Sequence, residues 1–509
     1  MTDQPDPQSK LVYHFINGET FLGSPQEWGD IIDPSTGNAI AQVAYATKED
    51  AHEAVQAAQI AFTAWSDTPP ASRAKILFRW RQLLEDNQQE IITHISREHG
   101  KSATEALGSL MRGLDVLEFS CGIPTHLKGD FSANVGRSVD SFSLRQPVGV
   151  VAVITPFNFP VMVALWCTSV AIACGNTVIL KPSEKNPSTA LLLATLADKA
   201  GLPKGVLNIL NGTQEAVNGL ITHPDVAAVS FVGQTSTAKY IQETAIRHGK
   251  RVQAFGAAKN HALVMPDADL VQTVDAIIGA AYGSAGERCM AISVVVAVGD
   301  TTADHLVRHI AQKAKILKIG SPFDDQGKDS QAEMGPLISH SHKEKVLSYI
   351  QKGITEGATL VLDGRTQEIP STGYFLGGSL FDHVMPEMSI YQDEIFGPVL
   401  CVVRVKSYEE GLQLINNHPY ANGVAIFTRD GDCARDFCHR IQVGMVGVNV
   451  PIPVPVGYHS FGGWKSSSFA DHGMHGMEGI RFFTKLKTVT SRWPSGIRSG
   501  IEFSLPTVE

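Results

Sequence analysis

Short apolar runs alternate with segments of helical periodicity between Val148 and His248. The runs are continuous and rich in β-branched residues, which is typical of strands that are buried on both faces. The predicted strands are 148–154, 177–181, 206–210 and 226–232, and the predicted helices between and after them are 188–200, 214–222 and 235–248. Alternation at this spacing predicts a doubly wound parallel sheet, which binds its ligands at the carboxyl ends of its strands.

A second block with the same alternation begins near His261 and predicts a second α/β domain. Its predicted helices are 270–282, 303–315 and 407–416, and its predicted strands are 292–298, 360–362, 399–405 and 423–427.

The chain before Val148 has a different pattern. Residues 11–45 predict short strands and turns, and helical periodicity follows over 51–65, 73–99 and 103–119. The apolar run Val161–Cys174 is shorter than the roughly twenty residues that span a bilayer, so it predicts a buried helix. The tail 482–491 alternates apolar and polar residues, as an edge strand does, and such a strand can pair between subunits.

Composition narrows the class of protein. The 509 residues are 43% hydrophobic and carry a net charge of −9, which argues against a nucleic-acid partner. The polar N-terminus has no signal-peptide pattern, and the 7 cysteines form no C-x-x-C pair. We therefore expect a soluble cytoplasmic protein that is not bound to a membrane and has no metal site.

The stretch Ser284-Ala285-Gly286-Glu287-Arg288-Cys289-Met290-Ala291 is the strongest candidate for chemistry. A thiol is nucleophilic as its thiolate, which a neighbouring cation such as Arg288 favours. Taken alone, the motif is more often a buried, inert cysteine beside a surface arginine.

Nucleotide binding has to be inferred without the usual G-x-G-x-x-G fingerprint, which the sequence lacks. Lys181 and Glu184 follow a predicted strand, where they can bind ribose hydroxyls. Gly233 and Gln234 follow another strand and open a helix, whose free N–H groups form an anion site.

Several motifs together resemble those of the NAD(P)-dependent aldehyde dehydrogenase family, in the family's order and over nearly the whole chain. They are Thr155-Pro156-Phe157-Asn158-Phe159-Pro160, Lys181-Pro182-Ser183-Glu184, Phe231-Val232-Gly233, Gly286-Glu287-Arg288-Cys289 and Glu394-Ile395-Phe396-Gly397-Pro398.

The resemblance implies a role for each of these positions. Cys289 is the nucleophile, and Asn158 with the Cys289 backbone N–H forms the oxyanion hole. The implied cofactor-binding residues are Thr155, Phe157, Lys181, Glu184, Gly233, Gln234, Glu394 and Phe396. A carboxylate at Glu184 repels a 2′-phosphate, so NAD is expected rather than NADP.

Two departures from the general family narrow the expected activity. The family's E-L-G-G-K motif, whose glutamate activates water, appears here as Phe255-Gly256-Ala257-Ala258-Lys259, and phenylalanine cannot act as a base. Arg288 and Arg112, the latter on a predicted helix, can together hold a substrate carboxylate.

Both departures resemble the CoA-acylating methylmalonate-semialdehyde dehydrogenase branch of the family. So do Lys259-Asn260-His261 and Arg288-Cys289-Met290-Ala291, although the glutamine usual in this branch is Glu287 here. The implied reaction is NAD-dependent oxidative decarboxylation of malonate or methylmalonate semialdehyde, with coenzyme A as co-substrate, giving acetyl-CoA or propionyl-CoA.

Three other readings remain open at this point. The chain can be a hydrolytic aldehyde dehydrogenase with another base, or a binding protein that kept the fold and lost the chemistry. A metal hydrolase is the third, but the His pairs 340/342 and 472/475 have no acidic ligand pattern and are better explained as solvated loops.

The resemblance also implies the domain organisation. Residues 1–123 and 146–255 form the NAD-binding domain, and residues 256–480 form the catalytic domain. Residues 124–145 and 481–509 form a β flap and tail that join subunits into a homo-oligomer, a dimer or a tetramer.

Overall fold

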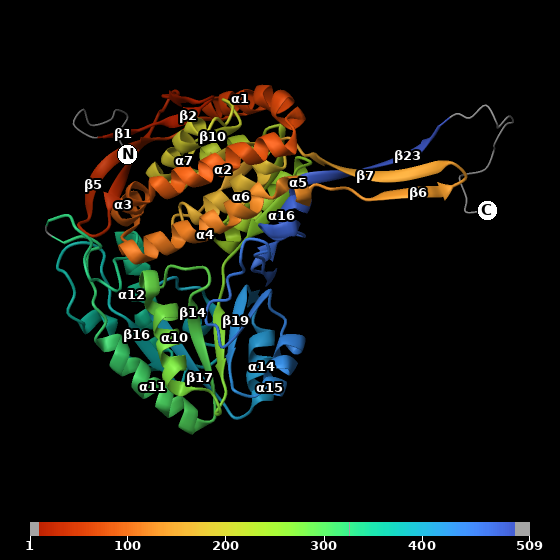
Figure 1. Cartoon of the computed structure of the whole chain (residues 1–509). Coiled ribbons are helices and arrows are strands. Elements are labelled where there is room, and N and C mark those ends of the chain that lie inside the picture. Colours follow the sequence, from red (N-terminus) through yellow and green to blue (C-terminus); the bar gives the residue numbers. More distant parts are fainter. Residues whose placement is uncertain (1–9, 325, 494–509) are drawn as a thin grey trace.

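The computed structural model describes residues 10–324 and 326–493 of the chain. It has two α/β bodies, one above the other in Figure 1, and a long β arm that projects from the upper body. The predicted α/β class with two sheets is confirmed, although both sheets are mixed rather than purely parallel.

The upper sheet has eight strands in the order β22-β12-β11-β8-β9-β10-β2-β3. Its strands are β2 (His14–Ile16), β3 (Glu19–Phe21), β8 (Val150–Ile154), β9 (Thr177–Lys181), β10 (Leu207–Ile209), β11 (Val226–Val232), β12 (Arg251–Phe255) and β22 (Ser468–Phe469). The inner strands β10, β9, β8, β11 and β12 run parallel, whereas β2, β3 and β22 pair antiparallel at the edges. A small sheet of β1 (Leu11–Val12), β4 (Trp28–Asp33) and β5 (Asn38–Ala44) lies on the N-terminal side of this body.

Helices cover both faces of the upper sheet (Figure 1). They are α1 (Lys48–Asp67), α2 (Pro70–Asp86), α3 (Gln88–His99), α4 (Ala103–Cys121), α5 (Ile123–His126), α6 (Met162–Ala173), α7 (Ser188–Lys199), α8 (Gln214–Thr222), α9 (Thr235–Arg247) and α16 (Gly476–Phe482). The predicted buried helix is α6, in which every residue is buried.

The predicted single helix over 73–99 is wrong, because the structure divides it at Asn87 into α2 and α3. Asn87 leaves helical geometry with φ −106° and ψ 20°, and its side-chain amide donates to the Leu83 carbonyl at 2.7 Å. Asparagine competes in this way with the backbone's own helical hydrogen bonds. Gly100, in the left-handed region at φ 88°, then ends α3.

The lower sheet has seven strands in the order β15-β16-β17-β14-β13-β19-β20. They are β13 (Asn260–Val264), β14 (Ile292–Val298), β15 (Thr359–Leu362), β16 (Ser379–Asp382), β17 (Val399–Val405), β19 (Gly423–Phe427) and β20 (Met445–Val448). The helices of this body are α10 (Leu270–Tyr282), α11 (Asp300–Lys315), α12 (His340–Thr355), α13 (Ser389–Gln392), α14 (Tyr408–Asn417) and α15 (Gly431–Arg440). A two-stranded pair, β18 (Tyr420–Ala421) with β21 (Trp464–Lys465), lies beyond its edge.

The arm consists of β6 (Phe131–Gly136), β7 (Val139–Pro147) and β23 (Thr484–Arg492). The predicted tail strand is β23, and it pairs antiparallel with β7 of the same chain from Thr484↔Pro147 to Arg492↔Val139. Within the described residues no second strand pairs with its other edge, so the arm presents an edge strand there. Residues 494–509 of the predicted tail, and residues 1–9, lie outside the described residues.

Among the described residues, no helix is long and apolar enough to cross a membrane. The two bodies meet where the segment after β8 faces the segment that precedes β14, and the chemistry-bearing motifs lie there.

Candidate active site

The segment that carries Cys289 follows a tight 3-10 turn, η1 (Gly283–Gly286), at the end of α10. Ser284, Ala285 and Gly286 all have left-handed backbone, with φ 54°, 50° and 75°. A Cβ atom on Gly286 would lie 2.2 Å from the Gly397 carbonyl oxygen, so only glycine lets the two segments approach. This turn brings the nucleophile motif against the Glu394–Pro398 motif.

Two asparagines hold the Cys289 carbonyl. Asn260 Nδ2 donates to it at 2.9 Å and to the Ala291 carbonyl at 3.0 Å, while Asn422 Nδ2 donates to it at 3.1 Å. Asn260 lies in the Lys259-Asn260-His261 motif, which predicted no role for it, and no motif in the sequence indicated Asn422. Both residues fix the backbone on which the thiol is mounted.

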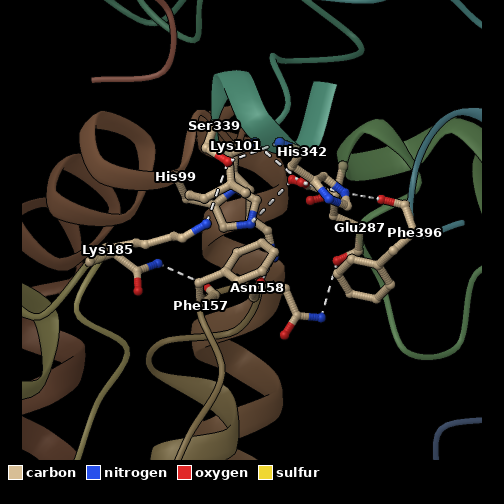
Figure 2. A network of polar contacts seen from close by, with 12 residues as sticks. His99, Lys101, Phe157, Asn158, Lys185, Glu287, Ser339, His342 and Phe396 are labelled. Carbon is tan, nitrogen blue, oxygen red and sulfur yellow. Dashed lines mark hydrogen bonds and ion pairs between the residues drawn. The ribbon is translucent and has the colours of Figure 1, made fainter. Parts of the chain in front are cut away.

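Asn158, predicted to lie in the oxyanion hole, comes from the segment after β8 and is 3% exposed. Its Nδ2 donates to the Glu287 main-chain carbonyl at 3.1 Å (Figure 2). An amide NH₂ has a second hydrogen, which is free to donate to an oxyanion beside Cys289. The geometry therefore brings Asn158 and the nucleophile segment together.

Lys101, at the start of the segment that leads into α4, is a site residue that the sequence analysis missed. Its Nζ donates to the Asn158 main-chain carbonyl and lies 3.7 Å from the centroid of the Phe159 ring. The side chain is 2% exposed, and burial lowers the pKa of Lys101 to about 7. In the sequence, Gly100-Lys101 after a predicted helix looks like an exposed helix end, so no local signal indicated that Lys101 lies in the site.

Burial, more than any charge, decides the state of the Cys289 thiol. Burial raises its pKa to about 12, Glu394 adds to this rise, and Lys101 opposes it. The cation expected to favour the thiolate was Arg288, but its guanidinium pairs with Glu105 at 2.7 Å. Lys101, not Arg288, is therefore the cation that acts on the thiol.

Cys289 lies between two cavities. The first, of about 310 Å³, is lined by five of the predicted cofactor-binding residues: Phe157, Gly233, Gln234, Glu394 and Phe396. Phe157 and Phe396 meet edge to face with ring centroids 6.0 Å apart, and Gln234 stands at the N-cap position of α9, where its side chain makes no capping hydrogen bond. Glu394 accepts the Ala258 N–H at 2.8 Å, and burial raises its pKa to about 7.

The other predicted cofactor residues lie at the carboxyl ends of β8 and β9 but do not line this cavity. Lys181 Nζ is 3.5 Å from Glu184 Oε2, and Thr155 donates its backbone N–H to the Lys181 carbonyl. Burial lowers the pKa of Lys181, and its partner Glu184 opposes that shift. The pair is thus placed beside the strand ends, where a ligand of the upper sheet binds.

The second cavity, of about 590 Å³, contains both arginines predicted to bind substrate, together with Lys101, Glu105, Phe159 and Cys289. Arg112, on α4, donates to the carbonyls of Val454 and Pro455 at 3.0 and 2.5 Å and pairs with Asp115 at 3.3 Å. Arg288 donates to the Gly279 carbonyl besides pairing with Glu105. Each guanidinium has more N–H donors than these contacts use.

Phe255 ends β12 and is 3% exposed. Its ring packs in the core of the upper body and contacts Phe461 at a centroid distance of 6.3 Å. The position where the general family carries its water-activating glutamate is therefore apolar and closed to water.

The histidines expected on solvated loops are placed differently. His342 lies on α12, is 14% exposed and lines the first cavity, while His475 is fully buried beside Trp166. The prediction of solvated loops is wrong for these two residues. Within 10–324 and 326–493, no group of three or more His, Cys, Asp or Glu side chains is placed to hold a metal ion.

A doubly wound sheet with a cysteine nucleophile, an amide oxyanion site and a cofactor-type cavity defines a thiol-dependent α/β enzyme. The model of the family described as "Aldehyde dehydrogenase family" matches residues 22–489. The chain belongs to the aldehyde dehydrogenase family.

Its relatives place it more narrowly. The chain is 54% identical over 500 residues to a malonate-semialdehyde dehydrogenase of Pseudomonas aeruginosa, covering 98% of this chain and 99% of that one. It is 46% identical over 480 residues to the malonate-semialdehyde dehydrogenase of Halalkalibacterium halodurans, covering 94% and 98%.

Solved structures agree with the relatives. A methylmalonate-semialdehyde dehydrogenase from Oceanimonas doudoroffii superposes with a TM-score of 0.93 at 51% identity, covering 96% of this chain and all of that one. A structure from Sinorhizobium meliloti, provisionally named methylmalonate-semialdehyde dehydrogenase and complexed with NAD, gives a TM-score of 0.94 at 51% identity, covering 97% of this chain and 100% of that one.

Proposed function

We propose that this enzyme oxidises malonate semialdehyde or its 2-methyl form with NAD, and transfers the decarboxylated acyl group to coenzyme A. The products are NADH, CO₂ and acetyl-CoA or propionyl-CoA. One observation carries the proposal: Cys289 shares a cavity with Arg112 and Arg288, on the side away from the cofactor-type cavity. The names of the relatives point to the same substrates.

Charge in the second cavity favours an anionic aldehyde. The charged side chains that line it are three cations, Lys101, Arg112 and Arg288, and one carboxylate, Glu105. A substrate carboxylate bound by the two arginines gains charge-assisted, bidentate hydrogen bonds. It also fixes the aldehyde carbon of a short chain near the thiol, which lowers the entropy lost in reaching the transition state.

The first cavity fits a dinucleotide. The N-terminus of α9 at Gly233 and Gln234 offers backbone N–H groups to a pyrophosphate, and Glu394 offers a carboxylate to ribose hydroxyls. Bound there, NAD supplies the hydride acceptor for aldehyde oxidation.

The chain's own groups perform the remaining steps. Cys289 attacks the aldehyde carbon as its thiolate, after the thiol proton has passed to solvent, and the free Asn158 amide hydrogen with the Cys289 N–H stabilises the oxyanion that forms. Loss of hydride leaves a Cys289 thioester that bears a carboxylate one carbon away. Loss of CO₂ places negative charge on the thioester oxygen, where Asn158 can stabilise it again, and the α-carbon then takes a proton from solvent to give the acetyl or propionyl thioester. A thiol then cleaves the thioester, because Phe255 provides no base for water.

We infer a homo-oligomer, a dimer or tetramer, assembled through the arm. Exposed apolar side chains lie along its strands, namely Phe131, Leu144 and Leu486. The division into an NAD-binding part (1–123 and 146–255), a catalytic part (256–480) and a flap with its tail (124–145 and 481–509) belongs to the same proposal. So does a cytoplasmic location, for which the free state of all seven cysteines is the support.

The deciding experiment is NADH formation from malonate semialdehyde with and without CoA. We expect one NADH per active site without CoA and steady turnover once CoA is added. Steady turnover without CoA would instead identify a hydrolytic aldehyde dehydrogenase. If no aldehyde gave NADH, the chain would instead be a binding protein that kept the fold and lost the chemistry.

A further inference from the structure

Cleavage of the Cys289 thioester by a thiol needs a group that takes the thiol proton. CoA is an alkyl thiol with a pKa of about 8.5, so most of it is protonated at neutral pH. We take the first cavity, which Cys289 lines, as the route by which CoA reaches the thioester. The titratable side chains that line the first cavity besides Cys289 are Lys185, His342, Lys345 and Glu394.

His342 has the hydrogen-bond arrangement of a base. Its Nε2 lies 2.7 Å from the Phe396 main-chain carbonyl and 3.5 Å from Glu287 Oε1 (Figure 2). A carbonyl oxygen only accepts, so Nε2 carries the hydrogen, and Nδ1 of the neutral ring has a free lone pair. No hydrogen-bond partner of Nδ1 is found in the described part of the chain.

Glu287 is the group that can stabilise a protonated His342. The carboxyl is fully buried, accepts the Ile338 N–H at 3.2 Å, and has His99 Nε2 4.0 Å away on its other oxygen. It stands two residues before the nucleophile. A carboxylate stabilises an imidazolium, which the neutral amide of glutamine cannot do.

We propose that His342, supported by Glu287, is the general base that takes the proton from the thiol that cleaves the Cys289 thioester. This inference rests on the proposed function, because a hydrolytic enzyme has no such step. The thiol S–H bond breaks and its proton moves to His342 Nδ1. The sulfur bonds to the acyl carbon, the bond from that carbon to Cys289 Sγ breaks, and its electron pair stays on Cys289. His342 then returns its proton to the Cys289 thiolate or to solvent.

The charges around Glu287 and His342 determine the pH at which His342 acts as the base. Burial raises the pKa of Glu287 to about 8, and the nearby Lys185 and Lys101 oppose this rise. Burial lowers the pKa of His342 to about 4, and Lys345 and Lys185 add to this fall. The neighbouring His99 stays neutral, because burial holds its pKa well below its usual range. Ionisation of Glu287 near pH 8 therefore provides the carboxylate that His342 needs, and thiolysis should rise through this pH.

The test compares two thiols on the preformed acyl-enzyme. Malonate semialdehyde and NAD without thiol give the NADH burst, and CoA or 5-thio-2-nitrobenzoate is then added. The second thiol is already ionised at neutral pH and needs no base. We expect His342→Gln to slow cleavage by CoA about 100-fold, while cleavage by the ionised thiol changes only a few-fold. Glu287→Gln should flatten the rise of CoA cleavage with pH.

His340→Gln is the matched control, because His340 lies on the same turn of α12 but is 72% exposed and lines neither cavity. Equal losses with both thiols in His342→Gln would show a merely structural role and overturn the inference, as would unchanged cleavage by CoA. If Glu394→Gln slowed cleavage by CoA far more than cleavage by the ionised thiol, and His342→Gln did not, the base would be Glu394 instead.

If His342→Gln gives no burst, His342→Ala with added imidazole takes its place. Recovery of CoA cleavage by imidazole supports the inference, and failure to recover it while the burst is intact opposes it. Steady turnover of the wild type without any thiol would overturn the proposed function itself. This outcome is measured on the wild type alone, so it is distinct from a failure of the His342 inference.

Discussion

Arg288 Nη2 lies 2.7 Å from Glu105 Oε1, so the arginine next to the nucleophile in sequence is tied to α4. The same carboxylate oxygen accepts the Ser284 N–H at 2.6 Å, at the start of the turn that leads to Cys289. Glu105 therefore fixes both the arginine and the turn. The ion pair with Glu105 orients Arg288 along the wall of the second cavity, where a substrate carboxylate would bind. Lys101 is the cation that lowers the pKa of the Cys289 thiol.

Separate roles for Arg288 and Lys101 give the first prediction. Lys101→Met should raise the pKa of Cys289 and slow its alkylation by iodoacetamide at a fixed pH about tenfold, since one pKa unit changes the thiolate fraction tenfold. Arg288→Ala should leave the alkylation rate within about a factor of two. The measurement is alkylation rate against pH for both variants. An equal shift in both would contradict the assignment of Lys101.

Arg112 gives the second prediction, which concerns substrate choice. Arg112→Ala should raise KM for malonate semialdehyde about 30-fold, because a hydrogen-bonded charge pair contributes about 2 kcal/mol. KM for propanal, which lacks the carboxylate, should change far less. Steady-state kinetics with both aldehydes decide this, and equal effects on the two would remove the carboxylate-binding role.

The sequence predicted four strands of each large sheet, because a buried strand between helices needs a continuous β-branched run, but it missed strands that include β12, β13, β16 and β20. Val226–Val232, Thr177–Lys181 and Ile292–Val298 begin and end where predicted. The break at Asn87 was missed, because the helical periodicity of apolar positions continues across it. In a sequence pattern, one asparagine is only a weak signal of a helix break.

The site was only partly predictable for a different reason. Cys289, Asn158 and Glu394 lie in motifs that carry their own signal, and the structure brings them around one cavity. Lys101 and Asn422 carry no local signal, since each acts through a main-chain carbonyl that is far away in sequence. His342 looked solvated because the fold, not its neighbours in sequence, buries it against Glu287.

Asn158 gives the third prediction. Asn158→Ala should lower the rate of the NADH burst about 100-fold to 1000-fold, because it removes an oxyanion donor. Affinity for NAD, measured by fluorescence titration, should stay within a few-fold of the wild type. A burst of normal rate would mean that the Cys289 N–H suffices as the oxyanion hole.

Glu287 gives a prediction for stability as a function of pH. Its pKa is raised by burial to about 8, above the 4.5 of the ordinary carboxyl, so the folded state binds the proton more tightly than the unfolded state. The stabilisation is complete below the ordinary pKa and is lost as the pH rises toward 8. The wild type should therefore lose about 1 kcal/mol of unfolding free energy per pH unit more than Glu287→Gln over this range. Urea unfolding of both proteins at pH 6 and pH 8 measures the difference, and parallel losses would show that the carboxyl is ionised throughout.

The last prediction concerns the arm. Leu486 on β23 is 58% exposed, and Leu144 at 42% and Phe131 at 66% lie on the other face of the arm, because Leu486 pairs with Arg145 and Phe131 pairs with Phe142. Exposed apolar side chains on both faces of a projecting sheet, whose edge strand β23 has no second strand partner in the described residues, favour contact with a second copy. Leu486→Glu should therefore lower the mass measured by light scattering on a sizing column, because a charge would have to be buried in the contact. Ile316→Glu is the matched control, since Ile316 is 76% exposed at the end of α11, away from the arm, and should leave the mass unchanged. An unchanged mass for Leu486→Glu would place the subunit contact on another surface.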